Sequence, residues 1–152
     1  MTRPPPSAST LEAFRQALGP GQTSEAPELL DGYRRDLSLV EGARPALIVY
    51  PESRAQLQSI VELAARTVTP LIPVSSGAPH SLGDTVPTAG GVIVDFGRRR
   101  GIIKLDAYNR LVRVEPGVTF AELLPALDRA GQRLNVPLAP RANKSVVTSA
   151  LE

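Results

Sequence analysis

The sequence feature that most constrains the fold is a strand–helix–strand pattern between residues 46 and 74. Residues 46–50 form a continuous apolar run of strand length, and Ser53 followed by Gln56 is the pattern of a capping box. A second apolar run covers residues 71–74. Between the runs, apolar residues recur at the spacing of one helix face: Leu57, Ile60, Val61 and Ala64. This order predicts a βαβ unit with parallel strands and a right-handed crossover.

The pattern then changes to a hairpin and a second helix. Residues 92–96, 102–105 and 111–115 are strand candidates, and residues 106–110 supply a hairpin turn between the last two. Thr119 and Glu122 form another capping box, which opens a helix that Gly131 stops. The apolar face of that helix carries Phe120, Leu123, Leu124 and Leu127. The fold class expected is therefore α+β: a βαβ unit, a hairpin and a second helix.

Two end segments are less regular. Ser9 and Glu12 read as a capping box for a helix that ends at Leu18, before a polar stretch with a short helical turn near residues 25–30. We expect residues 1–42 to be an N-terminal extension. At the other end, residues 133–136 look like a strand, and Pro137 and Pro140 impose an extended path after it.

Composition excludes several classes of protein. The chain has no Cys and one His, so disulfide scaffolds, Cys-based zinc sites, iron–sulfur clusters and thiol nucleophiles are excluded, and no metal site is expected. Aromatic residues make up 4% and the net charge is only +2, so nucleic-acid binding is not expected. No apolar run reaches the length of a membrane span, and the N-terminus does not resemble a signal peptide. We expect a cytoplasmic protein.

Residues 73–84 are the strongest candidate for a binding loop, because small residues follow a buried strand directly. Free backbone N–H groups in such a turn suit a pyrophosphate, and the hydroxyls of Ser75, Ser76 and Ser81 add donors. The loop matches neither the Rossmann nor the P-loop pattern, and an ordinary surface loop is the alternative. His80 is the only His, and either a functional role or exposure to solvent remains open.

Two further segments are candidates for ligand contact. Pro116 and Gly117 join a strand to a helix, and they either form a simple turn or allow a ligand to approach the backbone. The tail, residues 140–152, mixes small polar with apolar residues. It is either a frayed terminus or a ligand-contacting segment.

Taken in order, these pieces resemble the FAD-binding domain of the vanillyl-alcohol oxidase/para-cresol methylhydroxylase (PCMH) superfamily. The nearest branch is that of the FAD-linked oxidases glycolate oxidase and D-lactate dehydrogenase. The resemblance covers residues 43–152, which we expect to be the N-terminal part of a PCMH-type FAD-binding domain. The matching blocks, in family order, are residues 45–53, 57–65, 71–83, 92–98, 102–106, 110–118 and 123–131.

The resemblance implies that FAD is the cofactor and indicates which residues would contact it. The loop would wrap the pyrophosphate, Pro116 and Gly117 would line the cofactor cleft, and part of the tail would lie against the flavin. The implied cofactor-binding residues are Val74, Ser75, Ser76, Gly77, Ala78, Pro79, His80, Ser81, Pro116, Gly117, Pro140, Ser145, Val146, Thr148 and Ser149. Some family members attach flavin covalently through a His in this loop, and His80 lies close to that position.

The chain departs from the family pattern in two places. Residues 75–79 read Ser-Ser-Gly-Ala-Pro where many members have an Arg-Gly-x-Gly run. Residues 148–150 read Thr-Ser-Ala where members usually have a pair of glycines. Small residues are kept at both places.

The resemblance also implies a function and a missing part. It implies the FAD-binding part of an oxidoreductase that moves a hydride from a small 2-hydroxy acid or alcohol to FAD. The family's cap domain, which usually supplies the acid and base, has no counterpart here, so no catalytic residue is named. We expect a truncated chain or one polypeptide of a split enzyme, with a second polypeptide or a C-terminal region completing the site. The alternative is a degenerate, non-catalytic module that serves assembly.

Overall fold

The computed structural model describes residues 5–36, 38–76, 86–135 and 141–151. The chain divides into two compact units, and each is described by itself. The first unit contains residues 1–74 and 78–95, and the second contains residues 75–77 and 96–152. The chain therefore leaves the first unit for the second directly after the strand that ends at Val74.

The first unit is built on a sheet of four strands: β1 (Thr23–Ser24), β2 (Leu47–Val49), β3 (Leu71–Val74) and β4 (Val92–Asp95). The strand order is β1-β2-β4-β3, with β2 and β3 parallel to β4 and β1 antiparallel to β2. The predicted βαβ unit is confirmed, and β4 lies between its two strands. The short strand β1 was not predicted.

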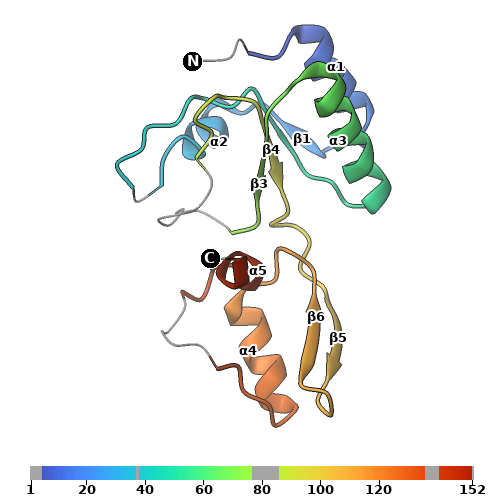
Figure 1. The fold of residues 1–152 in the computed structure, drawn as a ribbon, viewed down its shortest axis with the longest axis vertical. Coiled ribbons are helices and arrows are strands. Elements are labelled where there is room, and N and C mark those ends of the chain that lie inside the picture. Colours follow the sequence, from blue (N-terminus) through green and yellow to red (C-terminus); the bar gives the residue numbers. More distant parts are fainter. Residues whose placement is uncertain (1–4, 37, 77–85, 136–140, 152) are drawn as a thin grey trace. The chain divides into compact units, whose positions relative to one another are not determined.

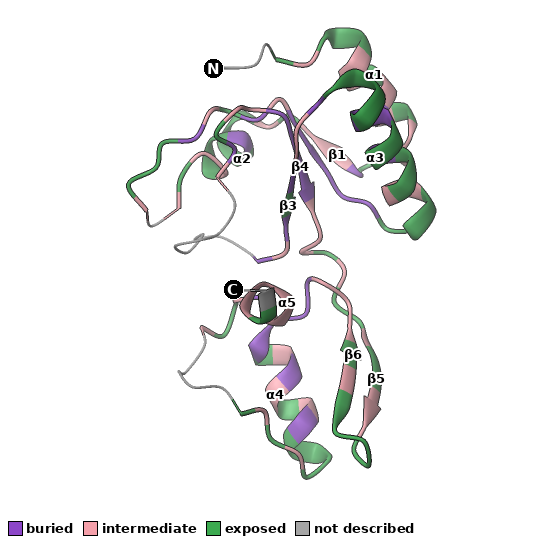
Figure 2. Cartoon of the chain, viewed as in Figure 1, coloured by how far each residue is buried: buried purple, intermediate pink, exposed green. Residues whose placement is uncertain are grey.

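Helices cover both faces of this sheet. Figure 1 shows α1 (Ala8–Gln16) and α3 (Arg54–Thr67) side by side on one face and α2 (Pro27–Gly32) on the other. Side chains of successive strand residues point to opposite faces, so both faces of a buried strand are apolar. Leu30 of α2 packs in one buried cluster with Ile48, Tyr50, Ile72, Val74 and Ile93. Figure 2 shows most of β4 as buried, and all three residues of β2 are buried too.

The helix starts were predicted with mixed success. Ser53 caps α3 as expected: its hydroxyl accepts from the Gln56 N–H, and the Gln56 side chain accepts from the Ser53 N–H. The predicted box at Ser9 is wrong, because the N-cap is Ser7, two residues earlier, and α1 begins at Ala8. Glu12 does not reach back to a cap and instead pairs with Arg15 at 2.9 Å.

The second unit contains the predicted hairpin and helix. Strands β5 (Ile102–Asp106) and β6 (Leu111–Val114) pair antiparallel, and the Asp106 carboxylate closes the turn by accepting from the Asn109 N–H at 3.0 Å. Helix α4 spans Phe120–Arg129, and its capping box at Thr119 is present. The hairpin and α4 share one apolar cluster, centred on Val118, Leu123 and Leu127.

The end of the chain differs from the expectation. Residues 133–135 form no strand, so that prediction is wrong for them, and residue 136 lies outside the described residues. Helix α5, Val146–Leu151, occupies part of the tail, which was interpreted from sequence as either a frayed terminus or a ligand-contacting segment and was not predicted to be helical. Among the described residues, no helix is long and apolar enough to cross a membrane.

Candidate cofactor-binding site

Four hydroxyl side chains from two distant segments meet in the second unit. Ser75 and Ser76 follow β3, whereas Ser145 and Thr148 belong to the tail, and we call these four residues the hydroxyl cluster. The Ser75 Oγ lies 3.0 Å from the Ser145 Oγ and 2.7 Å from the Thr148 Oγ1. The Ser76 Oγ accepts from the Ser145 N–H at 3.0 Å and lies 3.4 Å from the Thr148 Oγ1. The loop and the tail, which were predicted to share one ligand, are therefore in direct contact.

Backbone pairing places the tail at this position. Ser145 forms a β-bridge with Thr119, the residue that caps α4. On either side of the bridge, the Val146 N–H donates to the Val118 carbonyl at 2.9 Å and the Phe120 N–H donates to the Lys144 carbonyl at 3.2 Å. Ser145 is fully buried. The tail segment is thus an ordered part of the unit and not a frayed end.

The two departures from the family pattern lie against each other. Ser75 and Ser76 stand where many members have the Arg-Gly run, and Thr148 stands at the usual glycine pair. The hydroxyl of Thr148 contacts both serines. A hydroxyl can both donate and accept, so the polar side chains of the two segments satisfy one another. These hydrogen bonds hold the two segments in contact.

Pro116 and Gly117 contribute backbone contacts within the unit. The Pro116 carbonyl accepts from the Ser145 hydroxyl at 2.7 Å. A Cβ added at Gly117 would collide with the Phe96 carbonyl oxygen and lie 2.8 Å from that of Arg99. The Gly117 N–H also donates to the Arg99 carbonyl at 2.8 Å. Close packing of two backbone segments therefore already requires glycine here, without any ligand.

Glu115, beside this turn, is held as a carboxylate. One oxygen accepts from the Gly101 N–H at 2.8 Å, and the other accepts from Arg99, 2.7 Å from its Nη2. These hydrogen bonds, first that of Gly101 and then that of Arg99, lower the pKa of Glu115 below its ordinary value. From sequence alone, the basic run Arg98–Arg100 is most simply interpreted as a solvent-exposed flank of the hairpin. In the structure, Arg99 is half-buried in this ion pair.

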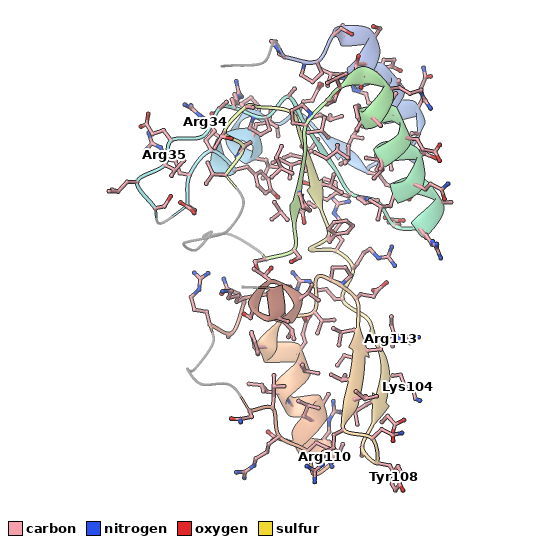
Figure 3. The ribbon with its side chains drawn as sticks, viewed as in Figure 1. Arg34, Arg35, Lys104, Tyr108, Arg110 and Arg113 are labelled. Carbon is pink, nitrogen blue, oxygen red and sulfur yellow. The ribbon has the colours of Figure 1, made fainter. Side chains whose placement is uncertain are left out.

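Exposed cations on the hairpin form a separate surface feature. Figure 3 shows Lys104 and Arg113 on the strands and Tyr108 and Arg110 at the turn. Lys104 is opposite Arg113 in the register and forms an ion pair with Asp106 at 3.1 Å. None of these side chains is in the hydroxyl cluster. The loop and tail, and not the hairpin, therefore remain the candidate site.

The other predicted contacts are placed differently. Val74 ends β3 with its side chain in the apolar cluster of the first unit, so only its backbone is suited to contact a ligand. Val146 packs against the apolar cluster of the second unit. The Ser149 N–H donates to the Ser145 carbonyl at 3.3 Å. Six predicted residues lie outside the described residues: Gly77, Ala78, Pro79, His80, Ser81 and Pro140.

Comparison with known proteins decides the family. A family model described as "FAD binding domain" matches residues 45–149. The chain belongs to this family. The match confirms the resemblance and identifies FAD as the cofactor. FAD also fits the residues present, because the loop begins with small, uncharged residues, Ser75 and Ser76, whose backbone a phosphate can approach closely.

Curated relatives share moderate identity with this chain. It is 32% identical over 130 residues to 1'-carboxy-chondrochloren decarboxylase of Chondromyces crocatus, covering 85% of this chain and 24% of that protein. It is 29% identical over 116 residues to the 4-cresol dehydrogenase flavoprotein subunit of Pseudomonas putida, covering 74% of this chain and 22% of that protein. The chain thus spans about a quarter of the length of these relatives.

Solved structures share the fold. The 4-ethylphenol oxidase of Gulosibacter chungangensis has a TM-score of 0.82 at 23% identity, covering 95% of this chain and 28% of that one. Substrate-bound p-cresol methylhydroxylase has a TM-score of 0.75 at 24% identity, covering 89% of this chain and 27% of that one. The expected α+β, PCMH-type fold is confirmed, and the chain covers part of it.

Proposed function

We propose that this chain supplies the FAD-binding part of a flavin-dependent oxidoreductase that oxidises a small 2-hydroxy acid or alcohol. Bound FAD would accept the hydride, and the residues of this chain would bind and orient it. The observation that carries the proposal is the contact between loop and tail in the hydroxyl cluster, within a chain that the FAD-binding family model matches.

The substrate class rests on the names of relatives. These include a glycolate oxidase subunit, a D-2-hydroxyglutarate dehydrogenase and a D-lactate dehydrogenase, at 25–26% identity to this chain. All three named substrates are 2-hydroxy acids. The cresol dehydrogenase relative is named as a flavoprotein subunit, which supports a partner polypeptide for this chain too. We propose that this partner, or a further region of the same protein, supplies the acid and base.

The site residues divide by position in this proposal. The backbone of the loop, residues 75–81, would hold the pyrophosphate, and the tail segment from Ser145 to Ser149 would lie beside the cofactor. Residues 43–152 would form the FAD-binding domain, with residues 1–42 preceding it. A covalent link through His80 and a cytoplasmic location remain predictions.

A degenerate, non-catalytic module is the second candidate, because both glycine-rich motifs are altered. The hydrogen bonds of Thr148 with Ser75 and Ser76 would hold the two segments together in either candidate, so flavin binding is needed to separate the two candidates.

Flavin content and flavin reduction separate the two candidates. The complete protein that contains this chain, with any polypeptide that copurifies, is denatured and its released flavin measured. The holoprotein is then mixed anaerobically with glycolate, D-lactate, D-2-hydroxyglutarate or 4-cresol. We expect about one FAD per chain and loss of the visible absorbance of oxidised flavin with one of the 2-hydroxy acids. Protein without flavin, even after incubation with FAD, would support the degenerate module.

A further inference from the structure

The hydroxyl cluster has a single consistent direction of hydrogen bonding. A carbonyl oxygen has no proton, so the Ser145 hydroxyl must donate to the Pro116 carbonyl, 2.7 Å away. A hydroxyl has only one proton, so the Ser75 hydroxyl must donate to Ser145 at 3.0 Å. By the same count, Thr148 donates to Ser75 at 2.7 Å.

The first three hydrogen bonds of this series are short, and the fourth is long. Their lengths of 2.7, 3.0 and 2.7 Å are normal for hydrogen bonds between hydroxyls and oxygens. Ser76 donates to Thr148 over 3.4 Å, which is a weak contact. Its oxygen nevertheless accepts from the Ser145 N–H at 3.0 Å. Three of the four protons are therefore fully used inside the cluster.

Burial agrees with an internal role for these hydroxyls. Ser145 is fully buried and Ser76 is 4% exposed. Ser75 and Thr148 are only partly buried, but Ser75 donates its proton to Ser145 and Thr148 donates its proton to Ser75, so neither proton is available for a ligand unless one of these bonds breaks. A phosphate would have to replace a bond that the protein already makes, and that exchange gains little.

We propose that Thr148, Ser75 and Ser145 are positioning residues that fix the start of the pyrophosphate loop, and that they do not donate to the cofactor themselves. This inference rests on the proposed function. These hydrogen bonds tie Ser75 to the Pro116 carbonyl and to α5, so the backbone at Ser75 and Ser76 is held in one position. Part of the entropy cost of ordering these two residues would then be met before FAD binds.

A double-mutant cycle on the complete protein tests this role. Thr148→Val and Ser75→Ala each remove one member of the same hydrogen bond, and Ser75→Ala also removes the bond to Ser145. Each should weaken FAD binding about fivefold or more, and the double variant should bind no more weakly than Ser75→Ala alone, because the shared bond is already lost there. Thr148→Ser keeps the hydroxyl and should restore most of the affinity.

Stability without flavin supplies the second readout. A positioning role predicts that Thr148→Val and Ser75→Ala lower the midpoint of urea unfolding of the flavin-free protein, again without additivity. Thr67→Val is the matched control. The Thr67 hydroxyl donates to the Leu63 carbonyl within α3 at 2.9 Å and accepts from the Thr69 hydroxyl at 2.8 Å, away from the hydroxyl cluster. This control should leave FAD affinity unchanged.

The outcomes separate the two proposals. Additive losses of FAD affinity with an unchanged flavin-free protein would mean that the hydroxyls contact the cofactor independently, and would overturn the positioning role. Wild-type affinity in Thr148→Val would overturn it as well. A wild-type protein that binds no FAD would overturn the proposed function, while the unfolding cycle would still show whether the hydroxyl chain exists.

Discussion

The two compact units differ in the extent of their buried apolar cores. In the first unit, the central strands carry fully buried side chains such as Leu47, Ile48 and Ile93. In the second unit, only Val118, Leu123 and Leu127 are buried in the apolar cluster, and the hairpin side chains around them are partly exposed. Figure 2 shows this contrast between β4 and the hairpin strands. Specific polar contacts, in the hydroxyl cluster and between Arg99 and Glu115, supplement the smaller core.

The comparison teaches where each unit is vulnerable. Burial of apolar area depends on many neighbours at once, so removal of one large side chain from the first unit leaves a cavity among fixed strands. A polar contact depends on a few atoms and is sensitive to pH or to a single hydroxyl. The candidate site lies in the unit with the smaller apolar core.

The largest expected effect is that of Ile93→Ala in β4. Ile93 is fully buried in the central strand of the sheet, so truncation should lower the free energy of unfolding by about 4 kcal/mol. Leu123→Ala in α4 should cost about 2–3 kcal/mol, because partly exposed neighbours can close around the gap. Urea unfolding measures both, and hydrogen exchange locates the loss of protection.

Ile103→Ala is the control for this pair, since Ile103 is 60% exposed and should change stability little. Equal costs for Ile93→Ala and Leu123→Ala would mean that the smaller core is as tightly constrained as the larger, and the contrast between the units would fail.

Local patterns predicted the first unit better than the candidate site. Apolar periodicity and the box at Ser53 were sufficient for β2, α3 and β3, because these signals lie within a few residues of each other. The insertion of β4 between the two strands depends on pairing between distant segments, and no local pattern encodes it. The unpredicted β1 consists of only two residues.

The candidate site shows the same limit more sharply. Sequence reasoning selected both segments of the hydroxyl cluster, but Ser75 and Ser145 are 70 positions apart, and their contact is set by the fold. It also missed α5, because prolines before the tail favoured an extended path. Gly117 was correctly marked as a close approach, yet the structure shows that the approaching group is the protein's own backbone.

The effect of intermediate size concerns a polar contact of the second unit, and it should depend on pH. Glu115→Gln removes the charge that Arg99 and the Gly101 N–H stabilise, and should cost about 1 kcal/mol at neutral pH. The pKa of Glu115 is lower in the folded than in the unfolded chain, so its contribution is complete above the ordinary value of 4.5. It is lost as the pH falls below that value and the carboxylate is protonated.

Unfolding curves measured from neutral pH downwards check this expectation. The stability difference between wild type and Glu115→Gln should shrink as the pH falls, whereas Glu62→Gln on the exposed face of α3 should show no such convergence. A constant difference at every pH would mean that the side-chain shape of Glu115, and not its charge, stabilises the turn.

The smallest effect has the opposite sign and concerns the first unit. Val68 ends α3 in the left-handed conformation, with φ 52°, and is 67% exposed. A β-branched residue is strained there, whereas glycine adopts this conformation freely and is the usual residue after a helix. Val68→Gly should therefore raise the free energy of unfolding by about 0.5 kcal/mol after its entropy cost is subtracted.

Val61→Gly is the matched comparison, because Val61 is also exposed but lies inside the same helix, where glycine should cost about 0.5–1 kcal/mol. A gain of stability for Val68→Gly together with a loss for Val61→Gly would show that the backbone at Val68 is strained. The larger apolar core of the first unit would then be sufficient to tolerate that strain. A loss of stability in both variants would mean that the Val68 side chain contributes more by its contacts than its backbone conformation costs.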